Sequence, residues 1–446
     1  MDRFFRLKEL GTNVRTEIMA GITTFMTMAY ILAVNPAILS GAGLGEYSVF
    51  LATALAAGIF TIAMGLFVNF PVALAPGMGL NAYFLTVVLS SNGEITPQMA
   101  LTAVFISGLI FIVLTVTKIR QLLVEAVPDA IKHAITVGIG LFITIIGLKN
   151  SGVMAINVLD DGDTLITLGH LSDPSVWLTL LGLALITILM VLKVKGAILI
   201  GILVTALIGA IPGVGVTDFS TLKSGQWVPD FTQLNFWHFD FAGLLTAGLL
   251  TAIATFTFVE LFDTFGTLVG TANRAGLLKD KAAGQKSIGK AMLVDAVSVS
   301  GGAMLGTSTV TAYVESSSGI AEGGRSGLTA VTTGVLFLLA LFLAPIALLI
   351  PSPATSAALV VVGVLMVQMI REIDFSDLVV AVPAFLTIVM MPLTYNIANG
   401  ISFGIVSYVL LALVGNLVSG KKHKIHWLMW VLFVLVILRY AFLGGE

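Results

Sequence analysis

A polar stretch in the second half of the chain decides the fold, and it reads GTSTVTAYVESSSG over residues 306–319. Most of its residues are small, hydroxyl-bearing or β-branched, and it carries an acid, Glu315. A counterpart in the first half, PGMGLNAYF over residues 76–84, has proline and glycine where a regular helix would begin. Glycine, proline and β-branched residues all weaken a helix. Each stretch therefore predicts a short extended segment that leads into a half-helix.

The composition around these stretches is that of a membrane protein. Hydrophobic residues make up 57% of the 446 residues and charged residues 10%, whereas soluble domains carry about 25% charged residues. Apolar runs of about 20 residues recur, each long enough to cross a hydrocarbon core of about 30 Å. In lipid such runs must be helices, because the bilayer offers backbone polar groups no partner. We therefore predict an all-α polytopic membrane protein.

The composition also argues against several kinds of site. The chain has no cysteine, so neither disulfides nor thiolate metal ligands are available. Its five histidines show no metal-ligand spacing, and no basic stripe suggests nucleic acid. We expect no metal, no cofactor and no nucleic-acid partner. The basic N-terminal segment lacks a small-residue cleavage site, so we expect no removable signal peptide.

Breakers between the apolar runs divide the chain into fourteen predicted spans. Those of the first half cover 16–36, 47–69, 76–91, 97–117, 127–149, 175–193 and 195–216. Those of the second half cover 241–268, 288–305, 309–322, 327–350, 353–371, 377–395 and 399–418. A further apolar segment, 425–443, fits either another span or a helix lying at the membrane interface.

Positive charges set the predicted orientation. With the N-terminus inside, the cationic connections fall on the cytoplasmic side, and they include Arg15, Lys118, Arg120, Lys193 and the patch at 421–424. The connections assigned outside are poor in lysine and arginine and carry acids, as at 160–163. We therefore expect a multi-pass protein of the bacterial cytoplasmic (inner) membrane with a cytoplasmic N-terminus.

The two halves of the chain resemble each other in collinear order. ITTF at 22–25 resembles IATF at 253–256, and LNAY at 80–83 resembles VTAY at 310–313. Seven spans per half is an odd number, so the halves are predicted to have opposite orientations, as in the inverted repeats of many carriers. The predicted units are a first repeat over 1–216, a second over 217–420 and a C-terminal segment over 421–446.

Two half-helices in such a repeat would leave free N–H groups and positive dipole ends near the membrane midplane. We expect these ends to face each other across a ligand. The alternative is that both stretches are loops whose small residues allow close helix packing. That alternative leaves Glu315 unexplained.

Four acids lie inside predicted spans and away from their ends: Glu260, Asp263, Asp295 and Glu315. The first two are three residues apart, so they share one helix face. Each carboxylate at the bilayer centre costs about 2.5–3.5 kcal/mol even on a lenient insertion scale, and burial with like-charged neighbours favours protonation. These acids therefore predict a site for a polar ligand and a proton. The alternative, strongest for Asp295, is that they satisfy hydroxyl and backbone donors and hold helices together.

Other residues near the site have simpler interpretations. Arg325, at the cytoplasmic end of the tenth span, is interpreted as a topology anchor or a loop partner. Phe25, Phe84 and Phe265 are candidates for stacking on a flat ligand, although most of the 27 phenylalanines must face lipid or the core.

Four motifs resemble the AzgA-type purine nucleobase permeases, a branch of the nucleobase–ascorbate transporter superfamily. They are ALAPGMGLNA at 73–82, FDTFGTL at 262–268, GTSTVTAYVES at 306–316 and PAFLTIVMMP at 383–392. The resemblance runs from about residue 10 to residue 420. It implies fourteen helices in two inverted repeats of seven. It also implies a core domain, about 16–117 plus 241–350, and a gate domain, about 127–216 plus 353–418.

The resemblance further implies proton-coupled uptake of purine bases such as guanine, hypoxanthine or adenine. By motif, Asn81, Glu260, Asp263 and Glu315 would surround the base, and the position of Glu260 varies among members. Asp295 looks like an acid that matters across the superfamily.

These expectations combine into one hypothesis of mechanism. Glu315 and Glu260 hydrogen-bond the purine edge, and Asn81 fixes its orientation. Thr311 and Phe265 complete the substrate site. Asp263, with Asp295 behind it, carries the coupling proton while the core moves against the gate.

Several alternatives stay open at this point. A carrier of the same architecture for xanthine, uracil or a small anion is one, although the acids would repel an anion. An intramembrane enzyme or a channel is another, but we find no nucleophile–base pair or HExxH motif, and we expect no enzyme. The preferred purine, the identity of the coupling ion and the formation of a homodimer in the lipid bilayer are left undecided by the sequence.

Overall fold

The structure is a computed structural model of the 446-residue chain. It describes all residues except 1, 92, 118, 159–163, 212–213, 218, 220–221, 223–226, 244–245, 278–280, 419–422 and 443–446.

The first half of the chain forms helices connected by short turns, together with one single strand, β1, and one hairpin. Its elements are α1 Asp2–Phe5, α2 Val14–Met28, α3 Ile31–Ser40, α4 Glu46–Ala63, the π-helical turn η1 Met64–Val68, β1 Leu74–Pro76, α5 Met78–Ser90, α6 Pro97–Val116, α7 Ile119–Ala126, α8 Asp129–Asn150, β2 Met154–Val158, β3 Thr164–Leu168, α9 Pro174–Val191 and α10 Ala197–Gly209.

The second half also consists mainly of helices and contains one strand among its described residues. Its elements are the 3₁₀ turn η2 Phe231–Gln233, α12 Ala247–Arg274, α13 Lys281–Leu305, β4 Val310–Ala312, α14 Ser316–Ala321, α15 Gly327–Leu339, η3 Ala340–Leu343, α16 Ala344–Ala347, α17 Ser352–Val367, η4 Gln368–Glu372, α18 Leu378–Leu393, α19 Ile397–Val418 and α20 Trp427–Phe442.

Nine helical segments in the described part of the chain are long and apolar enough to cross a membrane. They are Val14–Ser40, Glu46–Val68, Pro97–Val116, Asp129–Asn150, Pro174–Val191, Ser287–Leu305, Gly327–Ala347, Ser352–Glu372 and Ile397–Val418. Shorter apolar helices lie at Met78–Ser90, Ala197–Gly209, Gly248–Leu261, Leu378–Leu393 and Trp427–Ala441. The predicted polytopic helical architecture is confirmed, while the total of fourteen spans and the role of the last helix stay predictions.

The two predicted breaks are real, and they pair with each other. β1 and β4 form a two-stranded antiparallel sheet with Leu74 opposite Ala312 and Pro76 opposite Val310. The pairing extends beyond the strands, because the Gly77 N–H donates to the Thr309 carbonyl at 2.9 Å. The backbone groups that each broken helix leaves unpaired are thus satisfied by the other half of the chain, as an apolar environment requires. The predicted span at 309–322 is therefore a strand followed by the six-residue helix α14.

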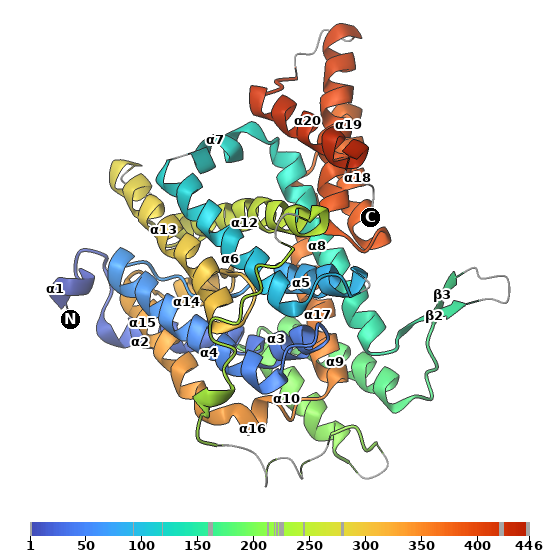
Figure 1. The fold of residues 1–446 in the computed structure, drawn as a ribbon. Coiled ribbons are helices and arrows are strands. Elements are labelled where there is room, and N and C mark those ends of the chain that lie inside the picture. Colours follow the sequence, from blue (N-terminus) through green and yellow to red (C-terminus); the bar gives the residue numbers. More distant parts are fainter. Residues whose placement is uncertain are drawn as a thin grey trace.

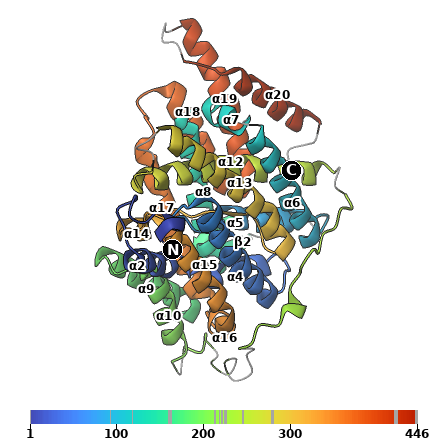
Figure 2. The same ribbon diagram turned by 90° about the vertical axis from the view of Figure 1, so that its left-hand side faces the viewer.

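The helices pack in two groups. In one, α8 contacts α17 and α18, α17 contacts α9 and α10, and α18 contacts α19. In the other, α15 contacts α2 and α4, and α6 contacts α12 and α13. Figures 1 and 2 show α9 and α10 at one end of the molecule and α19 and α20 at the opposite end. The strand pair lies within the second group, where β1 contacts α4 and β4 contacts α13.

Glycines allow the closest helix crossings in both groups. A Cβ atom built on Gly334 of α15 would lie 2.7 Å from the Gly58 carbonyl oxygen of α4. A Cβ atom on Gly363 of α17 would lie 2.5 Å from the Gly140 carbonyl oxygen of α8. Small residues at such crossings let backbones approach and gain packing where lipid removes the hydrophobic driving force. This explains the high glycine content of an otherwise apolar chain.

One element departs from the all-α prediction. β2 and β3 pair as an antiparallel hairpin between α8 and α9, with Ile156 opposite Ile166, and Figure 1 shows it projecting from the helical body. The sequence predicts an outside connection here that carries acids at 160–163. Residues such as TLIT in β3 are compatible with a strand.

Candidate functional site

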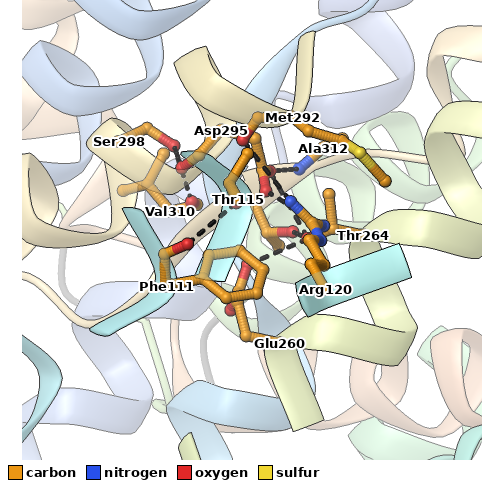
Figure 3. A network of polar contacts seen from close by, with 11 residues as sticks. Phe111, Thr115, Arg120, Glu260, Thr264, Met292, Asp295, Ser298, Val310 and Ala312 are labelled. Carbon is orange, nitrogen blue, oxygen red and sulfur yellow. Dashed lines mark hydrogen bonds and ion pairs between the residues drawn. The ribbon is translucent and has the colours of Figure 1, made fainter. Parts of the chain in front are cut away.

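A buried polar cluster lies where α12 and α13 meet the strand β4 (Figure 3). Asp295, Glu260 and Thr264 have no exposed surface, and Thr311 is 1% exposed. Oδ1 of Asp295 accepts the N–H of Ala312 at 3.1 Å. This hydrogen bond joins α13 to the strand. It agrees with the alternative in which Asp295 accepts from backbone donors and holds structural elements together.

One hydroxyl group connects the two carboxylates of this cluster. Oγ1 of Thr264 lies 3.1 Å from Oε1 of Glu260, 3.4 Å from Oδ1 of Asp295 and 2.8 Å from Oγ1 of Thr311. A hydroxyl has a single proton to donate, so Thr264 cannot satisfy both carboxylates at once. Thr311 can donate to Thr264 whichever acid receives the Thr264 proton. The arrangement is suited to a change of hydrogen-bond direction when one acid gains a proton.

A buried arginine faces these acids. Arg120, at the start of α7, is 1% exposed, and its Nη2 lies 3.8 Å from Oδ2 of Asp295. Its guanidinium carbon stands 4.1 Å from the ring centroid of Phe111. Burial lowers the pKa of Arg120, and the charges of Asp295 and Glu260 partly oppose that shift. Because arginine stays protonated in proteins, the cluster contains a permanent positive charge.

Asn81 lies in the first turn of α5, which follows β1. Its side chain is fully buried, and Oδ1 accepts the hydroxyl proton of Ser308. Nδ2 of Asn81 is buried without a hydrogen-bond partner among the described residues. A buried amide donor without a partner costs about 1–3 kcal/mol, so a ligand that accepts from Nδ2 would recover this energy.

Glu315 directly precedes α14 and is half-buried. Its Oε1 accepts the hydroxyl proton of Tyr30 at 2.8 Å. Tyr30 stands between α2 and α3, where the first span is interrupted, and is 1% exposed. The acid from the second half is thus oriented by a hydroxyl from the first half.

For the uptake function that the sequence resemblance implies, removing the Tyr30 hydroxyl should weaken substrate binding without abolishing transport. We expect Tyr30→Phe to raise the KM for a purine of the implied class about fivefold, because a lost hydrogen bond of about 1 kcal/mol leaves Glu315 less well oriented. The measurement is the concentration dependence of labelled hypoxanthine uptake. Tyr408→Phe is the matched control, since among the described residues that hydroxyl donates to the Lys424 carbonyl oxygen, at 3.4 Å. An unchanged KM in Tyr30→Phe would show that the bond does not orient Glu315 for binding.

Two predicted site residues cannot be placed in detail. Asp263 and Phe265 lie in α12, but their side chains are outside the described part of the structure. Of the other candidate aromatics, Phe84 is fully buried, and Phe25 packs edge-on against Phe337 with ring centroids 5.1 Å apart.

Three contributors escaped the sequence analysis: Arg120, Thr264 and Tyr30. Arg120 is counted there among the cytoplasmic cations, and nothing local distinguishes it from Lys118, because its acidic partners come from α12 and α13. Thr264 lies inside the FDTFGTL motif, close in sequence to the acids Glu260 and Asp263. This proximity is a weak sequence signal that Thr264 could belong to the site. Arg325 does act as a loop partner, donating from Nη1 to the carbonyl oxygen of Gly324 at 2.7 Å. No cluster of potential metal ligands occurs among the described residues.

Comparison with known proteins places the chain among transporters. A family model described as "Permease family" (Xan_ur_permease) matches residues 15–403. The guanine/hypoxanthine permease PbuG of Bacillus subtilis is 44% identical over 453 residues, which cover 99% of this chain and 100% of the relative. The adenine permease AdeP of Escherichia coli is 41% identical over 446 residues, which cover 100% of this chain and 97% of the relative.

Among solved structures, the transmembrane domain of the cyanobacterium bicarbonate transporter BicA has a similar fold. The TM-score is 0.64 at 15% sequence identity, and the match covers 87% of this chain and 97% of that one. At this identity the likeness concerns the fold alone, and it confirms the predicted membrane-transporter architecture.

Proposed function

The chain belongs to this permease family, and from that premise we propose that it takes up purine nucleobases together with protons. It is a multi-pass membrane transporter and not an enzyme. The relatives are named for guanine and hypoxanthine or for adenine, so the substrate class we assign is the uncharged purine base.

The observation that carries this proposal is the polar site built around the strand pair. A purine base is flat and presents N–H donors and ring-nitrogen acceptors along its edge. Glu315 offers a carboxylate already oriented by Tyr30, and Asn81 offers a buried amide donor without a partner. Carboxylate acceptors form charge-assisted hydrogen bonds that are about twice as strong as neutral ones. We assign substrate binding to Asn81, Glu260, Thr311, Phe265 and Glu315.

The same acids disfavour an anionic substrate. The fold is shared with a bicarbonate transporter, but two buried carboxylates face only one guanidinium in the described cluster. An anion entering next to Glu260 would be repelled by the like charge of that carboxylate. A neutral base accompanied by a proton fits this electrostatic environment better.

Alternating access would follow from the two packing groups. We assign the group around β1 and β4 to a core that carries the substrate, and the group around α8 and α17 to a gate. Contacts between them are made by α5 with α8 and by α3 with α17. Movement of a rigid core against the gate would expose the site to each side in turn. We further propose that the N-terminus is cytoplasmic.

Competition of transport tests the substrate class. Cells lacking their own purine permeases would express the chain and be given labelled hypoxanthine with a hundredfold excess of unlabelled adenine, guanine, xanthine or uracil. We expect at least one of adenine and guanine to suppress uptake and uracil to have little effect. Saturable uptake that uracil suppresses as well as the purines do would overturn the assignment.

Coupling to protons is assigned to Asp263 with Asp295 behind it. We expect Asp263→Asn to lose accumulation of purine against a gradient, since an amide cannot bind and release the coupling proton. Exchange of internal for external purine at equal pH should continue, because it requires no net proton movement. The measurement compares both modes in proteoliposomes. Undiminished accumulation driven by a pH gradient in this variant would rule out the assignment.

Asp129→Asn is the matched control for that variant. Asp129 is a largely exposed acid that pairs with Lys132 at 2.7 Å at the start of α8. The same chemical change there should leave both transport modes intact.

A further inference from the structure

An apolar groove lies between α4, α6 and α13, and the proposed transport cycle assigns it no role. Its volume is about 490 Å³, within the range of about 300–1,000 Å³ that small-molecule pockets have. Side chains of these three helices and of residues 236 and 237 line it. The groove therefore has room for a small apolar ligand or for part of a longer chain.

The groove runs along helices that are long and apolar enough to cross the membrane. On α13 the lining residues lie between Val297 and Leu305, and on α6 they lie between Phe105 and Ile112. They are spaced three or four residues apart, which places them on one face of each helix. Residues 297–305 rise about 12 Å along the helix axis at about 1.5 Å per residue. One leaflet is about 15 Å thick, half of a hydrocarbon core of about 30 Å, so the groove has nearly the length of one leaflet.

The helical lining offers no free polar side chain among the described residues. Ser300 is its one hydroxyl-bearing residue, and this hydroxyl donates to the carbonyl oxygen of Phe105 at 3.1 Å. Ile59, Leu109 and Val297 are each 44% exposed, so the groove is open along its side. A polar ligand would lose hydrogen bonds there. A hydrocarbon chain is the occupant that fits.

A segment between the two halves of the chain covers one end of the groove. We call this segment, residues 234–241, the strap. It lies where α4 begins and α13 ends. Its backbone N–H groups donate to all three helices: Asn235 to Ser48 Oγ of α4 at 3.0 Å, Trp237 to the Met304 carbonyl oxygen of α13 at 2.8 Å, and Asp240 to Thr102 Oγ1 of α6 at 3.0 Å. The strap is thus fixed to the helices that form the groove.

Trp237 of the strap has an unusual backbone conformation. Its φ is 57°, a left-handed value that is an outlier for a bulky residue and persists only where the surroundings hold it. Its ring packs against Phe105 and Phe239, with centroids 5.6 and 5.2 Å away. Trp237 and Phe236 line the groove, and both are more than half exposed. Tryptophan is enriched where the hydrocarbon core meets the headgroups, so the strap places an indole at the level where an acyl chain begins.

The surroundings of the groove lack positive charge. The sequence contains no lysine or arginine in residues 46–68, 97–117, 224–273 or 291–305, which include the strap and the groove-lining parts of the three helices. The strap itself carries an acid, Asp240. An anionic headgroup would find no lysine or arginine partner in these segments, whereas a headgroup without net charge needs none.

We propose that the groove between α4, α6 and α13 binds one acyl chain of a zwitterionic phospholipid, with Trp237 and Phe236 beside the start of the chain. In lipid there is no hydrophobic driving force for this contact. Binding rests on packing, because a chain that fills the groove regains dispersion contacts that a gap would forfeit. With a cytoplasmic N-terminus, the site belongs to the outer leaflet. The inference goes beyond the proposed function and does not depend on which substrate is carried.

Quenching of tryptophan fluorescence by brominated lipid tests the site. The full chain would keep Trp237 as its one tryptophan, with the other four replaced by phenylalanine. It would be reconstituted into phosphatidylcholine vesicles that contain a rising share of phosphatidylethanolamine brominated on its acyl chain. Bromine quenches an indole that it touches. We expect quenching of Trp237 to saturate at a low share of brominated lipid, because a bound chain stays next to the indole.

A groove-filled variant shows whether the quenching depends on the groove. In Leu109→Phe with Val297→Phe, we expect half-maximal quenching to need at least about threefold more brominated lipid, since the added rings take the place of the chain and remove its packing contacts. The matched control is Ile110→Phe with Leu293→Phe. These residues lie on the same two helices, are 39% and 40% exposed and do not line the groove. The control should behave as the parent does.

Native mass spectrometry of the protein with all its tryptophans gives a second readout. The wild type and the control should retain one phospholipid that the groove-filled variant loses. Equal quenching curves for the groove-filled variant and its control would overturn the proposal, and so would equal lipid retention. Stronger quenching by brominated phosphatidylglycerol than by brominated phosphatidylethanolamine would overturn the assignment of the headgroup. Neither measurement involves a purine, so a failure of the proposed function would leave these results unchanged.

Discussion

Replacing Glu315 with glutamine is expected to reduce purine uptake by about 100-fold. The carboxylate can accept two hydrogen bonds from a purine edge while its position is held by Tyr30. An amide offers one acceptor and an unwanted donor, and hydrogen bonds to charged groups are worth about 1.5–3 kcal/mol each. The loss should appear in kcat/KM for labelled hypoxanthine and in direct binding to the purified protein. It should not appear in the amount of folded protein.

Glu322→Gln provides the matched control for this change. Glu322 directly follows α14, the helix that Glu315 precedes, and it pairs with Lys195 at 2.7 Å at a partly exposed position. Exposed ion pairs contribute little, so uptake should stay close to that of the wild type. If Glu315→Gln bound hypoxanthine as tightly as the wild type, Glu315 would not contact the base.

Replacing Glu17 with alanine is expected to destabilise the protein by about 3–5 kcal/mol, because it leaves several hydrogen-bond donors without an acceptor, at a cost of about 1–3 kcal/mol for each buried one. Glu17, in α2, has no exposed surface, and its Oε1 accepts the backbone N–H of Arg325 at 2.9 Å. Its Oε2 accepts the N–H of Ser326 at 3.2 Å and both the N–H and the hydroxyl of Thr329. Thr329 lies in the first turn of α15, Ser326 is the N-cap of that helix and Arg325 directly precedes the cap. A carboxylate at this end also interacts favourably with the helix dipole.

Thermal unfolding in detergent measures this effect, together with the yield of monodisperse protein. We expect a clear drop in both for Glu17→Ala. Glu9→Ala is the control, because Glu9 forms an exposed pair with Arg6 near the same end of the chain. Equal unfolding temperatures for Glu17→Ala and the wild type would mean that the first turn of α15 is satisfied in another way.

The role of Glu17 illustrates what the sequence analysis could not reach. Glu17 is not singled out by the sequence, because its hydrogen-bond donors lie more than 300 residues away. Tyr30 with Glu315 and Arg120 with Asp295 are likewise pairs from opposite halves of the chain. A side chain that works through partners from the other half of the chain has no local pattern by which it can be found.

The two interrupted segments that contain β1 and β4 could be predicted, because their signal is local in the sequence. Glycine, proline, β-branched residues and an acid inside an apolar chain conflict with a regular lipid-facing helix, and this conflict is visible in the sequence alone. The sequence by itself determined a polytopic helical membrane protein, two interrupted segments and acids at 260, 295 and 315. Whether a run is long enough to span the bilayer, and whether it can form a regular helix there, depend on its local composition. Both can therefore be predicted from the sequence.

The tertiary structure decided how these parts meet. It paired Leu74–Pro76 with Val310–Ala312, placed Asp295 behind that strand pair as an anchor and brought Arg120 to it from a connecting helix. These contacts join groups that are distant in the sequence. They depend on how two helical groups pack around a buried charge, and hydrophobic periodicity carries no information about that packing.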